Sequence, residues 1–145
     1  MKSDRQEKAA EYFHQGYNCS QSVVMAFEDK IGIDKENLAK MSVGLGGGVG
    51  RMREVCGCVS GMAMVLGFLY GSEDPGSKNE VYPLVQKACE EFKKRNGSIV
   101  CRELLSGVPV TTGGTAEPRT ESFYKKRPCA EMIEQATEII EEMIQ

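Results

Sequence analysis

The sequence lacks several features that mark common classes of protein. It contains no tryptophan and a single histidine among 145 residues, which argues against a histidine-rich zinc site and against most forms of haem ligation. Basic residues are not in excess, because the net charge is -3. A nucleic-acid-binding protein usually carries a basic face, so we expect no nucleic-acid partner.

Long apolar segments are also missing. The apolar run Val59–Tyr70 has 12 residues, whereas a helix that spans a bilayer needs about 20. The first residues, MKSDRQEK, are polar and contain no hydrophobic region of a secretory signal. These two absences predict a soluble, cytoplasmic protein without a membrane span.

Strand patterns are absent too, since no segment alternates apolar and polar residues over a sustained length. Start signals for helices are clear instead: Ser3 with Gln6, and Asn18 with Gln21, each fit a capping box. The predicted fold class is all-α, a bundle of five or six helices that forms one domain over residues 1–145.

The most apolar segment predicts a buried central helix over about residues 56–70. It has no charged residue from Val59 to Tyr70, and a helix that is apolar on every face is expected to be buried. Glycines recur along it and just beyond it at four-residue spacings that allow a neighbouring backbone to come close. These glycines are Gly57, Gly61, Gly67 and Gly71.

Two other segments have an unusual composition. The glycine cluster at residues 44–50 follows no predicted strand and contains no Gly-Lys-Ser/Thr, so it predicts a tight bend or a close helix approach, and not a phosphate-binding loop. Residues 106–127 contain several glycines and prolines and predict a long irregular connection. The helix after Pro128 has an apolar face that either packs on the core or docks a second copy in a homodimer.

The six cysteines are too sparse for a disulfide framework but numerous for a reducing compartment, where cysteines often serve metal binding or catalysis. Five of them fall in the first turns of predicted helices, and Cys89 lies mid-helix on an apolar face, as a core residue would. The five are Cys19, Cys56, Cys58, Cys101 and Cys129.

The start of a helix favours a thiolate. Unpaired N–H groups and the helix dipole place partial positive charge there, and such sites lower a thiol pKa from about 8.5. Arg51, Arg53 or Arg102 would strengthen the effect if one of them lay nearby. A thiolate attacks disulfides, reacts with oxidants and binds soft metals, so the placement alone leaves these chemistries open. The alternative is that the cysteines are small apolar residues that fill helix ends.

No Cys-x-x-Cys pair is present, which excludes a thioredoxin-type motif and a standard zinc knuckle. Cys56 and Cys58 form a tight pair that could chelate a metal, and Cys19, Cys101 and Cys129 could complete a four-thiolate site. The candidate ligands for an iron–sulfur cluster or zinc are Cys19, Cys56, Cys101 and Cys129, and their spacing neither favours nor excludes this.

The cysteine pattern resembles the C_GCAxxG_C_C family of redox-active proteins. The matching segments are 16–21, 46–51, 56–61, 101–104 and Cys129. The resemblance implies four family cysteines, carried here by Cys19, Cys56, Cys101 and Cys129, and a redox role without a defined substrate. This sequence departs from the pattern at Cys58, where the family has alanine.

Three hypotheses follow. In the first, the protein is a thiol oxidoreductase in which Cys56 is the nucleophile, Cys19, Cys101 or Cys129 resolves it, and Cys58 is auxiliary. A Cys56–Cys58 bridge would be strained and easily reduced. In the second, the family cysteines hold an iron–sulfur cluster or zinc in an electron carrier. In the third, the thiols only pack within a helical interaction module. The redox partner or small-molecule substrate stays undefined.

Overall fold

The computed structural model shows an all-helical protein. It describes residues 1–145, except for the side chain of Lys126. Within that description no β-strand is present, and one isolated bridge pairs Val55 with Val100. The α-helices are α1 (Asp4–His14), α2 (Cys19–Met25), α3 (Glu28–Ile31), α4 (Lys35–Ser42), α5 (Gly57–Tyr70), α6 (Lys78–Asn96), α7 (Cys101–Leu104), α8 (Glu121–Lys126) and α9 (Cys129–Met143).

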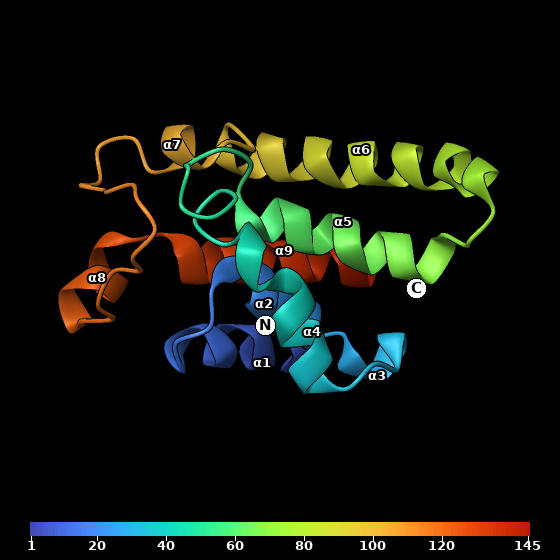
Figure 1. Cartoon of the computed structure of the whole chain (residues 1–145), viewed down its shortest axis with the longest axis horizontal. Helices are drawn as coiled ribbons and strands as arrows, with labels where there is room; N and C mark the ends of the chain where they lie inside the picture. The colour runs from blue at the N-terminus through green and yellow to red at the C-terminus, as the bar shows by residue number, and fades with distance from the viewer.

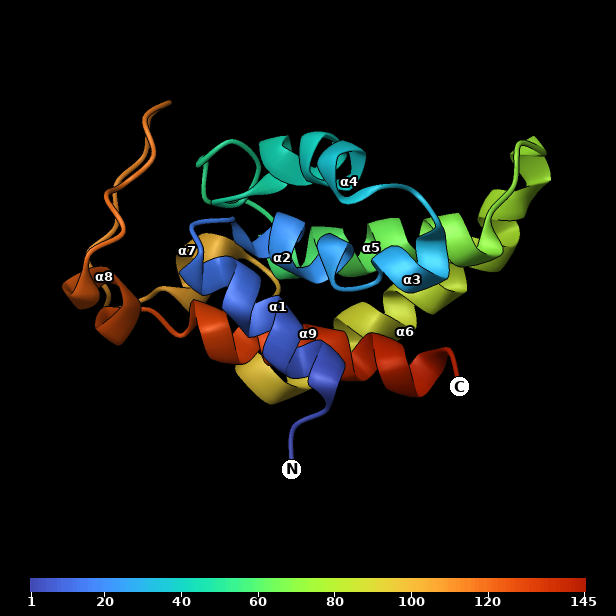
Figure 2. The same cartoon turned by 90° about the horizontal axis from the view of Figure 1, so that it is seen from below.

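The longer helices pack side by side (Figure 1). Helix α5 contacts α2, α6 and α9, and α9 also contacts α1 and α6. Figure 2 shows α1 crossing α9, and α4 covering α2 on the side away from α9. The core between these helices is formed largely by aliphatic and aromatic side chains, among them Phe27, Phe92, Met62, Leu66, Ile133 and Ile140.

The helices number nine in the described part of the chain, where the sequence predicted five or six. The difference comes from short helices. The helix predicted after Asn18 is interrupted at Phe27, whose φ of -105° and ψ of 19° separate α2 from α3. The predicted irregular connection at 106–127 contains α8, which Thr120 caps by accepting a hydrogen bond from the Phe123 amide.

The predicted capping boxes are confirmed. The Ser3 amide donates to Gln6 Oε1 at 2.9 Å and the Gln6 amide donates to Ser3 Oγ at 3.1 Å. Asn18 and Gln21 form the same pair of bonds at 3.0 Å each. The second box fixes the residue at which α2 begins, and therefore the position of Cys19.

Helix α5 is buried along one face and not on all of them. Its inward face includes Cys58, Met62, Val65 and Leu66, which are almost fully buried. Near its C-terminus Phe68 is 49% exposed. An apolar composition therefore predicted the burial of this helix only in part, because its packing partners leave one side open near its end.

Two of the helix glycines allow α5 to approach α2 closely. A Cβ atom on Gly57 would lie 3.0 Å from the Ser20 amide nitrogen and 3.2 Å from Cys19 Cβ. A Cβ atom on Gly61 would lie 3.0 Å from Val23 Cβ. The predicted role of glycine in close packing is thus confirmed at Gly57 and Gly61. Gly67 does not share this role, since a Cβ atom there would meet nothing within 4 Å.

In the part of the chain that the structure describes, no helix combines the length and the apolar character that crossing a membrane requires.

The glycine contacts predict opposite effects for two alanine substitutions in one helix. Gly61→Ala should lower the free energy of unfolding by about 1–2 kcal/mol, because overpacking outweighs the gain in helix propensity. The matched control Gly67→Ala should raise it by up to about 1 kcal/mol. Urea denaturation measures both. Equal stability of the two variants would contradict the close-packing role of Gly61.

Candidate functional site

A cavity lies where several helix starts and the glycine-rich loop meet. Its volume is about 340 Å³. Four cysteines from four segments line it, together with arginines and the aromatic ring of Phe123. The cysteines are Cys19, Cys56, Cys101 and Cys129, so the structure gathers the four residues that the family resemblance singled out.

Each of these cysteines stands at or next to a helix start. Cys19, Cys101 and Cys129 are the first residues of α2, α7 and α9, and Cys56 is the residue that precedes α5. The predicted placement at the first turns of helices is confirmed. Val100 is the cap of α7, and Pro128 is the cap of α9.

The other two cysteines are not part of the cavity wall. Cys58 is the second residue of α5, is fully buried and does not line the cavity. Cys89 is half-buried in α6 and packs against the core. Burial is the main cause that raises the pKa of Cys89, which agrees with the prediction of a core residue.

The glycine cluster forms a compact loop that turns the chain sharply into the cavity. Positive φ angles occur at Gly47, Gly48 and Gly50 and also at Val49, Arg51 and Arg53. The Gly50 amide donates to the Gly44 carbonyl at 2.8 Å, and the Glu54 amide donates to the Gly48 carbonyl at 2.9 Å. The loop is therefore a tight bend, as predicted, and it supplies two arginines to the cavity wall.

Backbone hydrogen bonds hold Cys56 and Cys101 on neighbouring segments. The Cys56 amide donates to the Ile99 carbonyl at 2.9 Å, and the Cys101 amide donates to the Glu54 carbonyl at 2.6 Å. These bonds flank the bridge between Val55 and Val100. The positions of both sulfurs are consequently set by paired backbone and not by a flexible loop.

The thiols around Cys19 differ in their protonation. Hydrogen bonds from Cys129 and then Cys58 hold the pKa of Cys19 well below its ordinary value, and the charges of Arg119 and Arg127 act in the same direction. The partners respond in the opposite sense. Their hydrogen bonds to Cys19 raise the pKa of Cys129 and of Cys58, and burial adds to both shifts. These neighbours therefore favour ionisation of Cys19 over ionisation of Cys58 or Cys129.

A helix start alone does not lower the pKa of a cysteine here. Cys101 begins α7, yet burial raises its pKa, and the Arg53 guanidinium, which donates to the Cys101 sulfur at 3.7 Å, opposes that shift without cancelling it. The causes that lower the pKa of Cys19 are likewise side chains, and the pKa values of Cys58, Cys101 and Cys129 are raised although these residues also lie at helix starts. Side-chain neighbours decide the direction.

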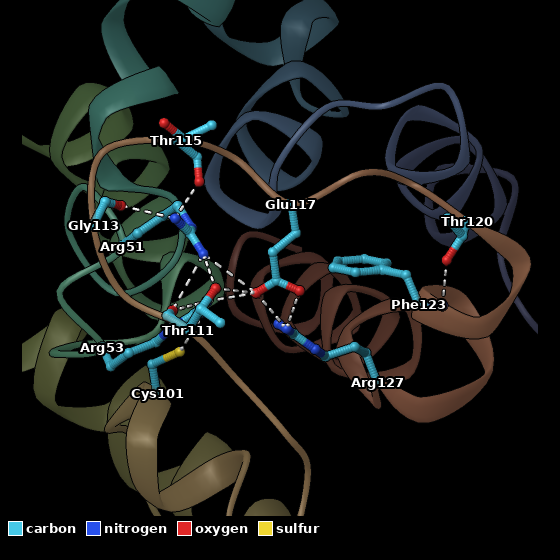
Figure 3. A network of polar contacts seen from close by, with 10 residues as sticks. All are labelled: Arg51, Arg53, Cys101, Thr111, Gly113, Thr115, Glu117, Thr120, Phe123 and Arg127. Carbon is cyan, nitrogen blue, oxygen red and sulfur yellow. Dashed lines mark hydrogen bonds and ion pairs between the residues drawn. The ribbon is translucent and has the colours of Figure 1, made fainter.

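Three arginines converge on one carboxylate beside the cysteines (Figure 3). Arg127 Nη2 lies 2.7 Å from both carboxylate oxygens of Glu117, Arg53 Nη2 lies 3.1 Å from Oε1, and Arg51 Nη2 lies 3.3 Å from it. Burial opposes ionisation of Glu117, but Arg127, Thr111 and Arg51 prevail and lower its pKa. Glu117 is therefore a carboxylate at neutral pH.

The segment 111–117, here called the strap, is held in place by the same arginines. Arg53 donates to the Thr111 carbonyl from Nε at 3.0 Å and from Nη2 at 2.8 Å. Arg51 donates to the Gly113 carbonyl at 2.8 Å and also to the Thr115 carbonyl. Figure 3 shows the strap passing over this network, with Glu117 pointing into it.

Sequence reasoning missed Glu117, Arg119 and Arg127. Of the arginines that it named, Arg53 contacts a cysteine, Arg51 binds the strap, and Arg102 forms an exposed pair with Glu54 at 2.5 Å. Arg119 donates to the carbonyls of Phe13 and Tyr17 and lies over the Phe13 ring. The sequence feature that could have revealed these three residues is that they are charged residues within the predicted irregular connection at 106–127.

Within the described side chains, no group of three or more His, Cys, Asp or Glu residues is arranged to hold a metal ion. The predicted ligand set of Cys19, Cys56, Cys101 and Cys129 shares a cavity but does not form such a group.

Comparison with known proteins identifies a family. The family model described as "Putative redox-active protein (C_GCAxxG_C_C)" matches residues 17–143, a range that contains all six cysteines and the strap. Searches of curated proteins and of solved structures gave no significant match.

Glu117 predicts a pH-dependent contribution to stability. Its pKa is lowered from the ordinary 4.5 on folding, so its contribution is fully present above that pH and is lost as the pH falls through the lowered value. Glu117→Gln should therefore reduce the free energy of unfolding at pH 7, and this deficit should shrink as the pH falls below 4.5, as measured by urea denaturation across this range. Glu36→Gln, in an exposed pair with Lys40, is the control. A Glu117→Gln deficit that is constant with pH would contradict the assignment.

Proposed function

The chain belongs to the C_GCAxxG_C_C family, and we propose that it is a thiol–disulfide redox protein in which Cys19 is the attacking thiolate. The observation that carries the proposal is the environment of the Cys19 sulfur. Cys129 and Cys58 lower its pKa through hydrogen bonds, the charges of Arg119 and Arg127 act in the same direction, and Cys19 lines the cavity. A thiolate that is stabilised in this way and open to a cavity is the reactive form of cysteine.

Cys19 is a better candidate for the nucleophile than Cys56, for which the sequence had predicted that role. The pKa of Cys19 is lowered by named partners. Cys19 is also half-buried, whereas Cys56 is 5% exposed. Since attack on a substrate requires both a thiolate and access, the first step is assigned to Cys19.

Cys129 is the candidate resolving residue. It provides the largest contribution to the low pKa of Cys19, and it lines the cavity. Cys58 also donates to Cys19, but it is fully buried and lies outside the cavity wall. The second attack must reach the Cys19 sulfur while a substrate group is attached, and Cys129 lines the same cavity as Cys19.

The proposed reaction is a balanced exchange with a disulfide substrate. The Cys19 thiolate attacks one substrate sulfur, the substrate S–S bond breaks, and the first substrate thiolate leaves. Cys129 then loses its proton to solvent and attacks the Cys19 sulfur. The mixed disulfide breaks, the second substrate thiolate leaves, and a Cys19–Cys129 disulfide remains. The substrate gains two electrons and the protein loses two.

The proposal includes one helical domain for residues 1–145 and a reducing, cytoplasmic environment, in which free thiols persist. All six cysteines are free thiols in the described structure. Metal binding by the family cysteines is the competing function, and its support is limited to the shared cavity. The iron and zinc content of the anaerobically purified protein distinguishes the two functions.

Cys19 should react at a lower pH than an ordinary cysteine. Its alkylation by iodoacetamide, followed for each cysteine by peptide mass spectrometry, should reach its plateau well below pH 8.5. Cys129→Ala removes a hydrogen-bond donor and should move the midpoint upward by about one pH unit. Cys89→Ala, outside the cavity, is the control. A wild-type midpoint near 8.5, or an unchanged midpoint in Cys129→Ala, would overturn the assignment.

Oxidation should join Cys19 to Cys129. After treatment of the reduced protein with an excess of a small disulfide, non-reducing peptide mapping should recover the Cys19–Cys129 pair. Cys129→Ser should instead accumulate a stable mixed disulfide on Cys19. Recovery of a Cys19–Cys58 pair would move the resolving role to Cys58. Stoichiometric iron or zinc bound through these cysteines would replace the proposal by the metal-carrier hypothesis.

A further inference from the structure

The cavity carries more positive charge than its own carboxylate neutralises. Four arginines line it, and Glu117 is the single acidic residue of its wall in the described structure. The arginines are Arg51, Arg53, Arg119 and Arg127. The proposed reaction with a disulfide uses this charge only to stabilise the Cys19 thiolate, and only Arg119 and Arg127 contribute there. Arg51 and Arg53 require a separate explanation.

The arginines hold the Glu117 carboxylate as a binding site would hold a carboxylate ligand. The side chains of Arg53 and Arg127 are only 7% and 6% exposed, so both guanidinium groups are nearly buried. Buried cations need an anionic partner, because an unpaired buried charge is costly. Arg127 contacts both Glu117 oxygens from one nitrogen, while Arg51 and Arg53 share Oε1. All of these contacts converge on the two oxygens of one carboxylate, and charge-assisted hydrogen bonds of this kind are the strong ones.

The strap that supplies this carboxylate has few other attachments. Its residues 111–116 are exposed. Among the described backbone groups, no amide of residues 109–119 donates a hydrogen bond to another backbone carbonyl. The strap is tied to the body largely by the bonds that Arg51 and Arg53 make to its carbonyls. An anion that competes for the arginines can therefore displace it without breaking a helix or a backbone ladder.

We propose that Arg51, Arg53 and Arg127 form the binding site for a carboxylate of the substrate, and that Glu117 occupies this site until substrate arrives. The substrate class is a small, carboxylate-bearing disulfide. The inference rests on the proposed thiol–disulfide function. A cavity of about 340 Å³ has the size of a small-molecule site, and Arg53 joins the carboxylate site to the sulfurs through its contact with Cys101 at 3.7 Å.

The site positions the disulfide, and no bond to its arginines forms or breaks in the reaction. With the carboxylate held by the arginines, the Cys19 thiolate attacks the nearer sulfur. The substrate S–S bond breaks, and one carboxylate-bearing thiolate leaves while the other half stays bound as a mixed disulfide. Cys129 then releases that half as a second thiolate. Each departing group is more negative than the corresponding half of the disulfide, so Arg119 and Arg127 favour its formation.

The test uses three disulfides of similar size that differ in charge. They are 3,3′-dithiodipropionate, bis(2-hydroxyethyl) disulfide and cystamine, which are anionic, neutral and cationic. The rate at which each reagent forms a mixed disulfide with Cys19 is measured in the Cys129→Ser protein. It is divided by the rate at which the same reagent reacts with a simple thiol, and this quotient is the corrected rate. The corrected rate should be about tenfold higher for the anionic than for the neutral reagent. This preference should diminish as salt is added.

Two substitutions and a matched control locate the preference. Arg51→Gln should lower the anionic-to-neutral ratio towards one, because it removes a charge from the carboxylate site. Glu117→Gln should raise the ratio, because the amide competes less well than the internal carboxylate. Arg102→Gln removes a nearby arginine whose side chain is 55% exposed and pairs with Glu54, and it should leave the ratio unchanged. Circular dichroism shows whether each variant is folded. If Glu117→Gln is not folded, the rate ratio of Arg51→Gln alone decides the test.

The outcomes separate this inference from the proposed function. If Cys19 reacts with all three reagents at equal corrected rates, or prefers cystamine, the carboxylate site is wrong and the thiol function stands. If Cys19 reacts with none of them, the proposed function fails first. A ratio that falls equally in Arg51→Gln and Arg102→Gln would show a general charge effect and would overturn the assignment to the cavity.

Discussion

The close contact between α5 and α2 is the constraint on which the site depends. Gly57 and Gly61 have no side chains, so the start of α5 lies directly against Cys19, Ser20 and Val23. The same contact brings Cys58 within hydrogen-bonding reach of Cys19. Larger residues at the two glycines would separate the helices and move Cys58 away from Cys19. The close packing at Gly57 and Gly61 is thus also what sets the surroundings of the Cys19 sulfur.

Electrostatics adds a second layer from a different part of the chain. Arg119 and Arg127 belong to the region after the strap, yet they act on a cysteine of α2. Arg51 and Arg53 come from the glycine-rich loop and bind the strap. The cavity is therefore completed by two irregular segments and not by the helices alone. Such segments carry side chains to positions that regular packing does not reach.

The sequence was sufficient to predict the all-α class, the capping residues Ser3 and Asn18, the close-packing glycines and the gathering of cysteines at helix starts, because these are local or periodic signals. It was insufficient for Glu117, Arg119 and Arg127, since residues 106–127 have no period from which a direction could be inferred. It also could not rank the thiols. Cys19, Cys101 and Cys129 all begin helices, and only their tertiary neighbours distinguish them.

The coupling between the thiols gives the proposed reaction an order. While Cys19 is a thiolate, its hydrogen bond and charge raise the pKa of Cys129, with burial as a further cause, and Arg127 opposes them. Attack on a disulfide converts the Cys19 thiolate into a neutral mixed disulfide, so the largest cause that keeps Cys129 protonated disappears while Arg127 remains. Cys129 then ionises more readily, at the step where it must attack. The pair therefore does not need two thiolates at once, which like-charge repulsion in a buried site would oppose.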